Sequence, residues 1–318
     1  MLRHIMERWR MMKAYELIER ARSISADDLL GVIDEVERLI SDEIRGSGRL
    51  RLRGRLIYIP PAGEAAIIGD LHGDIESLKH ILVDSEFVEK ASRGEDARII
   101  FLGDYGDRGI HSPEVYFVVL SLKAMFPDRV VLLQGNHEGP PDLLAHPHDL
   151  PYHLQLKFGG EWSRVYDALC NLFRRFYTAA LVPGRFLMVH GGVPAGITGV
   201  DDLAYAYQRH PSESLLEEIL WSDPRDGISG VLPSPRGAGR LFGEDVTSAA
   251  LEALNVKFIV RGHEPAAEGY KFNHNGKVLT LFSRRGPPYY NIQGAYLMLD
   301  LNEEFKSAWQ LEGYIRKF

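Results

Sequence analysis

The sequence predicts an α/β fold in which two mixed β-sheets pack face to face as a sandwich and helices flank them. Between residues 65 and 137, apolar strand-like runs alternate with helix-like segments, the pattern of βαβ units around a largely parallel sheet. After residue 258 a second group of strand-like runs follows, with little helix between them. The 318 residues are 45% hydrophobic, so the chain can bury a large core. Together these observations favour two packed sheets in a single domain.

Residues 1–49 are expected to form an N-terminal helical segment that packs on the main domain, residues 50–318. Ser25 and Asp28 have the spacing of a capping box, and Gly46 lies where such a helix would end. Between these signals, apolar residues recur at helical spacing: Leu29, Leu30, Ile33, Val36, Leu39, Ile40 and Ile44. The segment has no catalytic character, so packing is the expected role and docking of a partner is the alternative.

The elements of the main domain are expected to begin with one short strand over residues 50–58. Helices are expected over 75–83 and 113–125, the second with Ser112 as N-cap and Pro113 in its first turn. Further on, the sequence predicts a mostly helical stretch over 152–178, interrupted at Gly159-Gly160, and strands over 178–182 and 185–189 joined by a turn at Pro183-Gly184.

The last hundred residues contain a loop-like segment and then a series of strands. Residues 221–243 are rich in glycine and proline, and we expect a long loop there, functional if it borders an anion site. Strand-like runs follow at 278–282, 295–301 and 305–311.

Composition excludes several classes of function. The formal net charge of −7 argues against non-specific nucleic-acid binding. Cys170 is the only cysteine, so no disulfide framework or thiolate metal site is possible, and we expect it on the packed face of a helix. No apolar run approaches the roughly 20 residues of a membrane span, and residues 1–10 lack the hydrophobic stretch of a signal peptide. A cytoplasmic protein that binds neither membranes nor nucleic acid is therefore expected.

Polar side chains directly follow five apolar runs. The runs and the residues after them are 65–68 before Asp70 and His72, 97–102 before Asp104, Asp107 and Arg108, 130–133 before Asn136 and His137, 185–189 before His190, and 257–260 before His263. Open α/β sheets bind ligands beyond the carboxyl ends of their strands, so these side chains are expected to meet.

Six of these residues are the ligand types that a pair of divalent cations requires: Asp70, His72, Asp104, Asn136, His190 and His263. Two cations about 3.5 to 4 Å apart need a bridging carboxylate, for which Asp104 is the natural choice. Taken singly, each residue has a simpler interpretation, since an aspartate after glycine is commonly a turn residue and a lone histidine is commonly part of the core. As six consistent strand-end positions, they favour a dinuclear metal site.

Such a site also needs groups that hold a substrate and protonate a leaving group. Arg108 and Arg236 could clamp phosphate oxygens with their forked donors. His137 is the candidate general acid, and Asp107 is expected to fix its tautomer. For Arg108 the alternative is a solvated residue at a helix start, and for His137 it is another metal ligand beside Asn136.

The motifs together resemble the phosphoprotein phosphatase (PPP) family of serine/threonine phosphatases, within the calcineurin-like metallophosphoesterases. The matching motifs are residues 69–73 (GDLHG), 103–109 (GDYGDRG), 135–138 (GNHE), 190–192 (HGG), 220–224 (LWSDP), 236–243, 261–263 (RGH) and 279–283. They occur in the family's order from about residue 50 to 301, and the set is far more specific than any single motif.

The resemblance implies a metallophosphoesterase fold and a metal-dependent protein serine/threonine phosphatase, a hydrolase acting on phosphoric monoesters. One metal would take Asp70, His72 and Asp104, and the second Asp104, Asn136, His190 and His263. Arg108, Asn136, His137 and Arg236 would contact the phosphate of a phosphorylated protein or peptide. A metal-bridging hydroxide would attack phosphorus directly while His137, backed by Asp107, protonates the departing oxygen. Mn²⁺ is the expected metal in assays, with Fe or Zn as alternatives.

Three departures from the family pattern concern specificity. Asp74 and Gln134 replace the usual Gln and Arg of the eukaryotic enzymes, and residues 284–291 (RRGPPYYN) replace an Ala-Pro-Asn-Tyr-Cys loop. These differences favour an archaeal or bacterial branch, and they leave regulatory partners undefined.

Two other functions are compatible with the motifs. A phosphodiesterase or dinucleotide polyphosphate hydrolase on the same metal site is the nearer alternative. A non-catalytic binding scaffold is the more distant one, because a scaffold would not need Asp107, Arg108 and His137.

Overall fold

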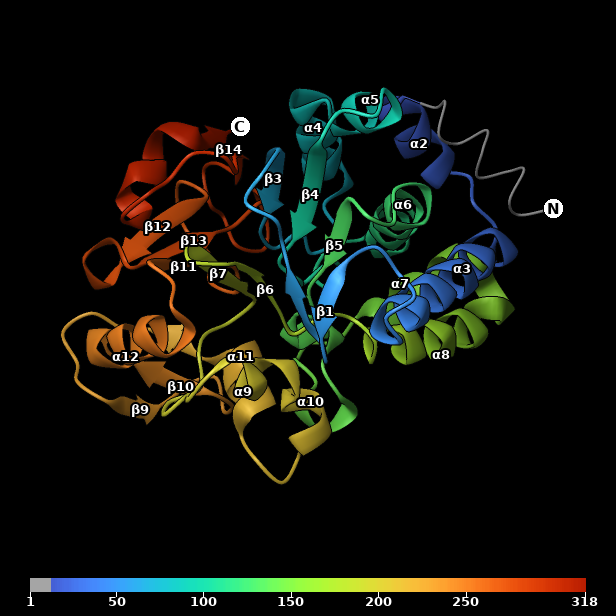
Figure 1. Ribbon diagram of the computed structural model, residues 1–318. Helices are drawn as coiled ribbons and strands as arrows, with labels where there is room; N and C mark the ends of the chain where they lie inside the picture. Colours follow the sequence, from blue (N-terminus) through green and yellow to red (C-terminus); the bar gives the residue numbers. More distant parts are fainter. Residues whose placement is uncertain (1–12) are drawn as a thin grey trace.

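Two mixed β-sheets lie face to face at the centre of the computed structural model, which describes residues 13–318 (Figure 1). The opening residues 1–10, considered above for a signal peptide, lie outside the described part. One sheet has the strand order β1 (Arg51–Arg53), β2 (Leu56–Tyr58), β6 (Ala179–Val182), β7 (Phe186–Val189), β11 (Phe258–Arg261), β13 (Val278–Leu281) and β12 (Tyr270–Asn273). The other has the order β15 (Ile315–Lys317), β14 (Ala295–Asp300), β3 (Glu64–Ile68), β4 (Ala97–Phe101) and β5 (Val130–Leu132). The predicted fold class is confirmed.

Strand register places the carboxyl ends of the parallel strands at one edge. In the second sheet, Ile68 pairs with Phe101 and Phe101 with Leu132. In the first, Val189 of β7 pairs with Arg261 of β11. The residues that follow these five strand ends are therefore delivered to a common region.

Helices cover the two sheets on different sides (Figure 1). Beside the second sheet lie α2 (Ala14–Ala21), α3 (Ala26–Ile44), α4 (Ile75–Ser85), α5 (Phe87–Ser92), α6 (Ser112–Met125), α7 (Leu150–Phe158) and α8 (Trp162–Phe173). The first sheet is covered by α9 (Val200–Ala204), α10 (Ala206–Arg209), α11 (Leu215–Trp221) and α12 (Glu244–Leu254). Short 3-10 helices are η1 (Asn136–Glu138), η2 (Pro141–Leu143), η3 (Gly159–Glu161), η4 (His274–Gly276) and η5 (Ala308–Tyr314). None of the helices in residues 13–318 is long and apolar enough to cross a membrane.

The helix α3 begins with the predicted capping box. The Ser25 hydroxyl accepts a hydrogen bond from Asp28 N, and the Asp28 carboxylate accepts one from Ser25 N. The apolar face of α3 packs on α6 and α8 and joins the core that lies between the sheets. The boundary predicted between residues 49 and 50 stays a prediction.

Several predicted elements differ from the structure. Residues 50–58 form two strands, because Gly54 adopts a left-handed φ of 54° and turns the chain into a hairpin. The helix predicted from Pro113 begins at Ser112, so its N-cap is His111 and the Ser112 hydroxyl donates to Gly109 O.

The predicted strand over 305–311 is wrong. Phe305, Ala308 and Leu311 are buried at a spacing of three, which is the period of the 3-10 helix η5 found there.

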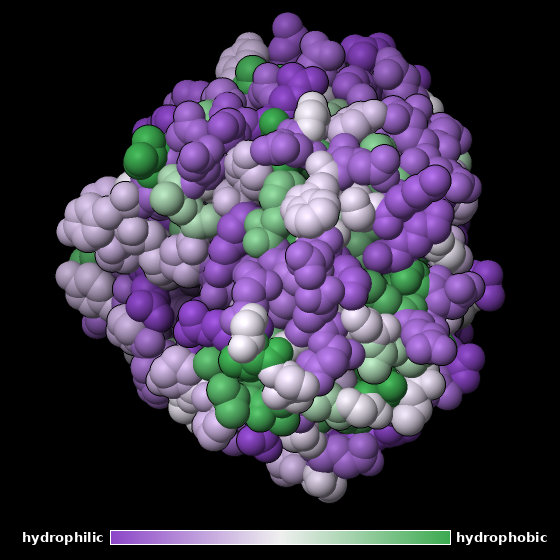
Figure 2. Space-filling view, turned by 90° about the vertical axis from the view of Figure 1, so that its left-hand side faces the viewer, coloured by the Kyte–Doolittle hydropathy of each residue, from purple (hydrophilic) through white to green (hydrophobic). Residues whose placement is uncertain are grey.

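The segment 221–243 was predicted to be a loop but contains a small sheet, in the order β8 (Asp223–Pro224), β10 (Arg240–Phe242) and β9 (Val231–Pro233). Its edge strand β9 exposes Val231 and Leu232. Figure 2, which shows the left-hand side of Figure 1, presents a mostly hydrophilic face with a group of hydrophobic residues toward its lower edge. This surface agrees with a chain in which 25% of the residues are charged.

A buried ion pair ties α3 to α6. Lys123 is fully buried, and its ammonium group donates to Glu43 Oε1 at 2.7 Å and to the carbonyls of Pro127 and Val130. The second Glu43 oxygen accepts a short hydrogen bond from the Tyr177 hydroxyl. Both charges are thus satisfied only when the N-terminal helix is in place.

Glu43→Ala should lower the free energy of unfolding by about 3 to 5 kcal/mol, because it leaves the Lys123 charge buried without a counterion. Urea denaturation would measure the change. Glu35→Ala, which removes an exposed pair with Arg38 from the same helix, is the matched control and should cost less than about 1 kcal/mol. Equal losses in the two variants would show that the buried pair has no special role.

Candidate metal centre

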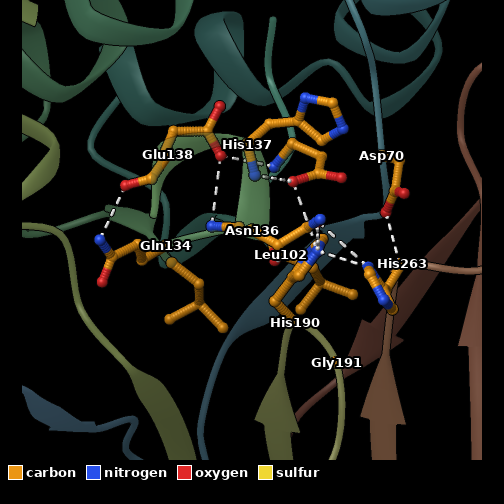
Figure 3. Close-up of polar contacts among 12 residues, drawn as sticks. Asp70, Leu102, Gln134, Asn136, His137, Glu138, His190, Gly191 and His263 are labelled. Carbon is orange, nitrogen blue, oxygen red and sulfur yellow. Dashed lines mark hydrogen bonds and ion pairs between the residues drawn. The ribbon is translucent and has the colours of Figure 1, made fainter. Parts of the chain in front are cut away.

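The polar residues after the five strand ends meet at a cavity of about 620 Å³. Seven of the predicted site residues line it: His72, Asp104, Arg108, Asn136, His137, Arg236 and His263. Asp70 and His190 lie behind them and are buried. The structure therefore brings all the predicted ligand residues into one region (Figure 3).

One group of ligand atoms is formed by Asp70, His72 and Asp104. His72 Nε2 lies 3.7 Å from Asp70 Oδ2 and 3.5 Å from Asp104 Oδ2. The other ring nitrogen of His72 donates to Gly106 O at 3.0 Å, which leaves the Nε2 lone pair directed at the carboxylates.

The second group is formed by Asp104, Asn136, His190 and His263. His190 Nε2 lies 3.3 Å from Asp104 Oδ1, 3.0 Å from Asn136 Oδ1 and 3.2 Å from His263 Nδ1. His190 Nδ1 donates to Leu102 O, so its Nε2 also presents a lone pair. Asp104 offers one oxygen to each group, as a bridging carboxylate must.

Most ligand atoms of the two groups face other hydrogen-bond acceptors instead of donors. Asp70 Oδ2 is buried without a hydrogen-bond partner, and His190 Nε2, Asn136 Oδ1 and His263 Nδ1 face one another. The Asn136 amide oxygen faces acceptors, with the Asp104 oxygens at 3.0 and 3.2 Å, and only exchange of the amide oxygen and nitrogen would let it donate there. Cations satisfy all of these lone pairs at once, and bonds of about 2.1 Å place neighbouring ligand atoms about 3 to 3.5 Å apart, as observed. The residues fit two divalent cations.

His137 is also close to the first group. Ligand atoms of His72, Asp104 and His137 lie within 4.8 Å of one another, as do those of Asp104, His190 and His263. The interpretation of His137 as an additional ligand is therefore geometrically open, although its Nδ1 is engaged elsewhere.

Burial sets the protonation of the cluster. It raises the pKa of Asp70 to about 7 and the pKa of Asp104 well above its ordinary value, where the Asp70 carboxylate adds to the effect. Burial also lowers the pKa of His72, His190 and His263 well below their ordinary value. The imidazoles are thus neutral ligands, and a cation replaces the protons that the carboxylates otherwise take up.

Several site residues adopt left-handed backbone conformations. The φ angles are 43° for His72, 55° for Asp104, 61° for Asp107, 68° for Arg108 and 74° for His263. Such conformations are costly for residues other than glycine and persist where the surroundings enforce them. The side chains are therefore aimed by tight turns at the strand ends.

Glu138 enforces one of these turns, and the sequence reasoning gave it no role. Its carboxylate accepts hydrogen bonds from Asp104 N, Tyr105 N and Gly135 N, and from the Tyr116 hydroxyl at 2.6 Å. It joins the turn after β4 to the turn after β5 (Figure 3). Its position in the GNHE motif was the available signal.

The predicted pair of His137 and Asp107 is present. His137 Nδ1 donates to Asp107 Oδ2 at 2.6 Å. His148, which sequence reasoning missed, donates to the same oxygen at 2.8 Å. Burial would raise the pKa of Asp107, but these two hydrogen bonds outweigh it and lower the pKa below its ordinary value. Asp107 is therefore a carboxylate anion.

Arg108 and Arg236 both line the cavity. Arg108 Nη2 donates to His146 O at 2.9 Å, and Arg236 Nε donates to Asp223 at 2.7 Å. Asp223 is held in turn by the fully buried Arg261, another residue that the sequence reasoning left without a role. Both predicted arginines are thus anchored beside the ligand groups.

Comparison with known proteins agrees with this geometry. The sequence profile of calcineurin-like phosphoesterases matches residues 65–267. The chain belongs to the calcineurin-like phosphoesterase family. It is 35% identical over 246 residues to the serine/threonine-protein phosphatase 4 catalytic subunit of Saccharomyces cerevisiae, covering 75% of this chain and 76% of the yeast subunit.

A probable serine/threonine-protein phosphatase of Encephalitozoon cuniculi is 32% identical over 308 residues, or 94% of this chain, which spans 62% of that relative's length. The solved structure of a Saccharomyces cerevisiae protein serine/threonine phosphatase with similarity to human phosphatase PP5 covers 93% of this chain and 90% of its own, with a TM-score of 0.73. At 21% identity it shows a shared fold. The resemblance to the PPP phosphatases is confirmed by these relatives.

Two departures from the family pattern now have structural explanations. Asp74 is the N-cap of α4, since its side chain accepts hydrogen bonds from Ser77 N and Ser77 Oγ. Gln134 Nε2 donates to Glu138 O at 2.8 Å and so braces the turn that carries Asn136 (Figure 3).

The third departure, the loop over 284–291, lies against the candidate metal centre. The Tyr289 ring stacks on His72 with centroids 5.3 Å apart and an interplanar angle of 27°. Arg284 donates to the carbonyls of Asp70 and His72. The loop thus contacts two of the ligand residues directly.

Divalent cations should stabilise the protein more at pH 8 than at pH 6. Because the pKa of Asp70 is raised to about 7, a cation must displace a proton at pH 6 but not at pH 8. For the same reason the metal-free protein should lose stability as the pH rises through 7, since the folded state binds that proton more tightly than the unfolded state.

Thermal unfolding of chelator-treated protein with and without excess Mn²⁺ measures the effect. Cations at about 100 times their Kd contribute about 2.7 kcal/mol, a Tm rise of roughly 4 °C at pH 8 and less at pH 6. Asp70→Asn, which keeps the shape but removes one of the two carboxyl groups whose pKa is raised, should reduce the difference between the two pH values. An equal Tm rise at both pH values in the wild type would contradict the assignment.

Proposed function

We propose that this chain is a metal-dependent protein serine/threonine phosphatase that hydrolyses phosphomonoesters. The observation that supports it is the convergence, at one cavity, of six residues of metal-ligand type, two anchored arginines and the His137–Asp107 pair. A non-catalytic scaffold would not need Asp107, Arg108 or His137.

The six residues would hold two cations. Asp70, His72 and Asp104 form one ligand set, and Asp104, Asn136, His190 and His263 form the other. Two such cations neutralise the charge of phosphoryl oxygens and acidify the attacking water. Nitrogen and oxygen ligands suit Mn, Fe and Zn, and Mn²⁺ is the choice for assays.

Arg108, Arg236 and Asn136 would orient the phosphate. The guanidinium groups of Arg108 and Arg236 line the cavity, and each keeps a permanent charge directed at it. Arg108 donates to His146 O, and Arg236 donates to Asp223 and to His263 O, so the remaining donors are held in position for phosphate oxygens.

His137 would protonate the leaving oxygen. Its Nδ1 proton is held by Asp107, so the ring presents Nε2 to the cavity. When the bond between phosphorus and the serine or threonine oxygen breaks, His137 Nε2 supplies the proton that this oxygen needs. The Asp107 carboxylate stabilises the protonated imidazole before transfer.

Phosphorylated proteins or peptides are the substrates that fit this proposal, as the names of the two relatives describe serine/threonine-protein phosphatases. A cytoplasmic location, the archaeal or bacterial branch, and the absence of membrane or nucleic-acid partners stay predictions from composition and motifs. A phosphodiesterase or dinucleotide polyphosphate hydrolase is the alternative that the same metal centre could support.

A phosphatase assay on phosphoserine, phosphothreonine and phosphotyrosine peptides, with Mn²⁺ and with chelator, tests the proposal. We expect Mn²⁺-dependent release of phosphate from phosphoserine and phosphothreonine peptides and little hydrolysis of bis-p-nitrophenyl phosphate. Activity that survives chelation would sink the metal mechanism. Dominant diester or phosphotyrosine hydrolysis would replace only the substrate class.

His137→Ala should lower kcat on a phosphoserine peptide by about 10²- to 10⁴-fold, because the leaving oxygen loses its acid. Metal content, measured by atomic absorption, should remain that of the wild type. Loss of bound metal in this variant would instead identify His137 as a ligand, the alternative that its distance from His72 and Asp104 allows.

A further inference from the structure

The Asp107 carboxylate has more hydrogen-bond donors than an orienting partner of one histidine requires. Its Oδ2 accepts from His137 Nδ1 and from His148 Nδ1, at 2.6 and 2.8 Å. Its Oδ1 accepts from the backbone N–H groups of Asp149 and Leu150, at 2.9 and 2.7 Å. Three of the four donors thus come from residues 148–150, a segment outside every motif that identified the family.

We infer that His148 is a positioning residue for His137, acting through Asp107. The inference rests on the proposed phosphatase function and adds a residue to it. His148 does not line the cavity, and its side chain is only 9% exposed. Its effect on the reaction is therefore exerted through the carboxylate.

Hydrogen bonds fix the orientation of the His148 ring. Its Nδ1 donates to Asp107, and its Nε2 lies 2.9 Å from the Tyr166 hydroxyl in α8. Burial raises the pKa of Tyr166, so this hydroxyl keeps its proton. The ring of His148 is thus held between Asp107 and α8 by both of its nitrogens.

The carboxylate is consequently oriented before His137 contributes. An aspartate carboxylate rotates easily about its last torsion, which has broad, roughly two-fold preferences. Here Oδ1 is held by two backbone N–H groups, and Oδ2 is held by His148. Removing His148 frees the oxygen that holds the His137 ring, and loose support of this kind is costly to catalysis.

The same segment also supports the phosphate side of the cavity. Asp149 Oδ1 accepts from Arg108 N at 2.9 Å, and His146 O accepts from Arg108 Nη2 at 2.9 Å. Residues 146–150 therefore bracket both Asp107 and Arg108. Within this bracket, His148 is the side chain that reaches Asp107, so it can be tested separately from the backbone contacts.

Two amide substitutions separate the contacts of His148. His148→Asn places an N–H donor near the position of Nδ1, so it can bond to Asp107 but cannot reach Tyr166. His148→Gln extends its amide toward Tyr166 and away from Asp107, and His148→Ala removes both contacts. His111→Asn, at a histidine whose side chain is 45% exposed and has no contact with Asp107, is the matched control.

The experiment measures kcat and KM with Mn²⁺ on a phosphoserine peptide and on p-nitrophenyl phosphate, whose leaving group needs little protonation. His148→Ala and His148→Gln should lower kcat on the peptide about tenfold or more, with KM and metal content unchanged and a much smaller effect on p-nitrophenyl phosphate. His148→Asn should restore most of the rate, and Tyr166→Phe should have a small effect.

The inference is overturned if His148→Asn is as impaired as His148→Ala, if both substrates lose rate equally, or if only KM changes. A wild type that hydrolyses neither substrate would refute the proposed function instead. In that case ¹⁵N NMR of the histidine rings decides the positioning role: the His137 Nδ1 signal should change in His148→Ala and be kept in His148→Asn. An unchanged signal in His148→Ala would overturn it.

Discussion

The hydrogen bonds to Glu138 are the constraint on which the site depends. This buried carboxylate fixes the backbone after β4 and after β5 at the same time, and those two turns carry Asp104 and Asn136. Gly103, at φ 109°, allows the two backbones to approach so closely that a Cβ there would lie 2.5 Å from Gly135 N. The position of Asp104 between the two ligand groups is thus set by backbone contacts between neighbouring turns, and its carboxylate accepts a hydrogen bond from His137 N.

Many hydrogen-bond acceptors and few hydrogen-bond donors surround the turn that carries Asp104. Burial lowers the pKa of three imidazoles and so keeps them neutral, and two carboxylates lie beside them. The backbone carbonyls of Gly106 and Leu102 accept hydrogen bonds from Nδ1 of His72 and His190. In a medium of low polarizability such an arrangement is costly unless a positive charge enters it. The fold therefore tolerates an unfavourable cluster of acceptors, and that cluster favours cation binding. The positive charges of Arg108 and Arg236 would in addition attract an anionic substrate.

Sequence reasoning succeeded where chemistry and topology coincide. Asp70, His72, Asp104, Asn136, His190 and His263 directly follow apolar strands, and parallel strands end at one edge, so their meeting could be predicted. His148, Arg261 and Glu138 could not be assigned roles in this way. His148 lies on an irregular segment whose path depends on tertiary packing. Arg261 acts through buried partners that no spacing reveals, and the place of Glu138 in the GNHE motif does not show that its carboxylate would bind backbone N–H groups. The strand predicted over 305–311 failed because its apolar residues recur at intervals of three, the period of a 3-10 helix, whereas a strand buries every second residue.

The left-handed conformations at the site have a consequence for how this protein can change. Elsewhere in the chain a strained residue can be replaced by glycine, which relieves the strain at little cost. At His72, Asp104, Asp107, Arg108 and His263 that route is closed, because each side chain takes part in the site. Every one of these positions holds a conformational penalty that no substitution can remove while keeping the chemistry. Stability and activity are therefore in direct competition at these five residues, and any gain in stability must come from other parts of the molecule.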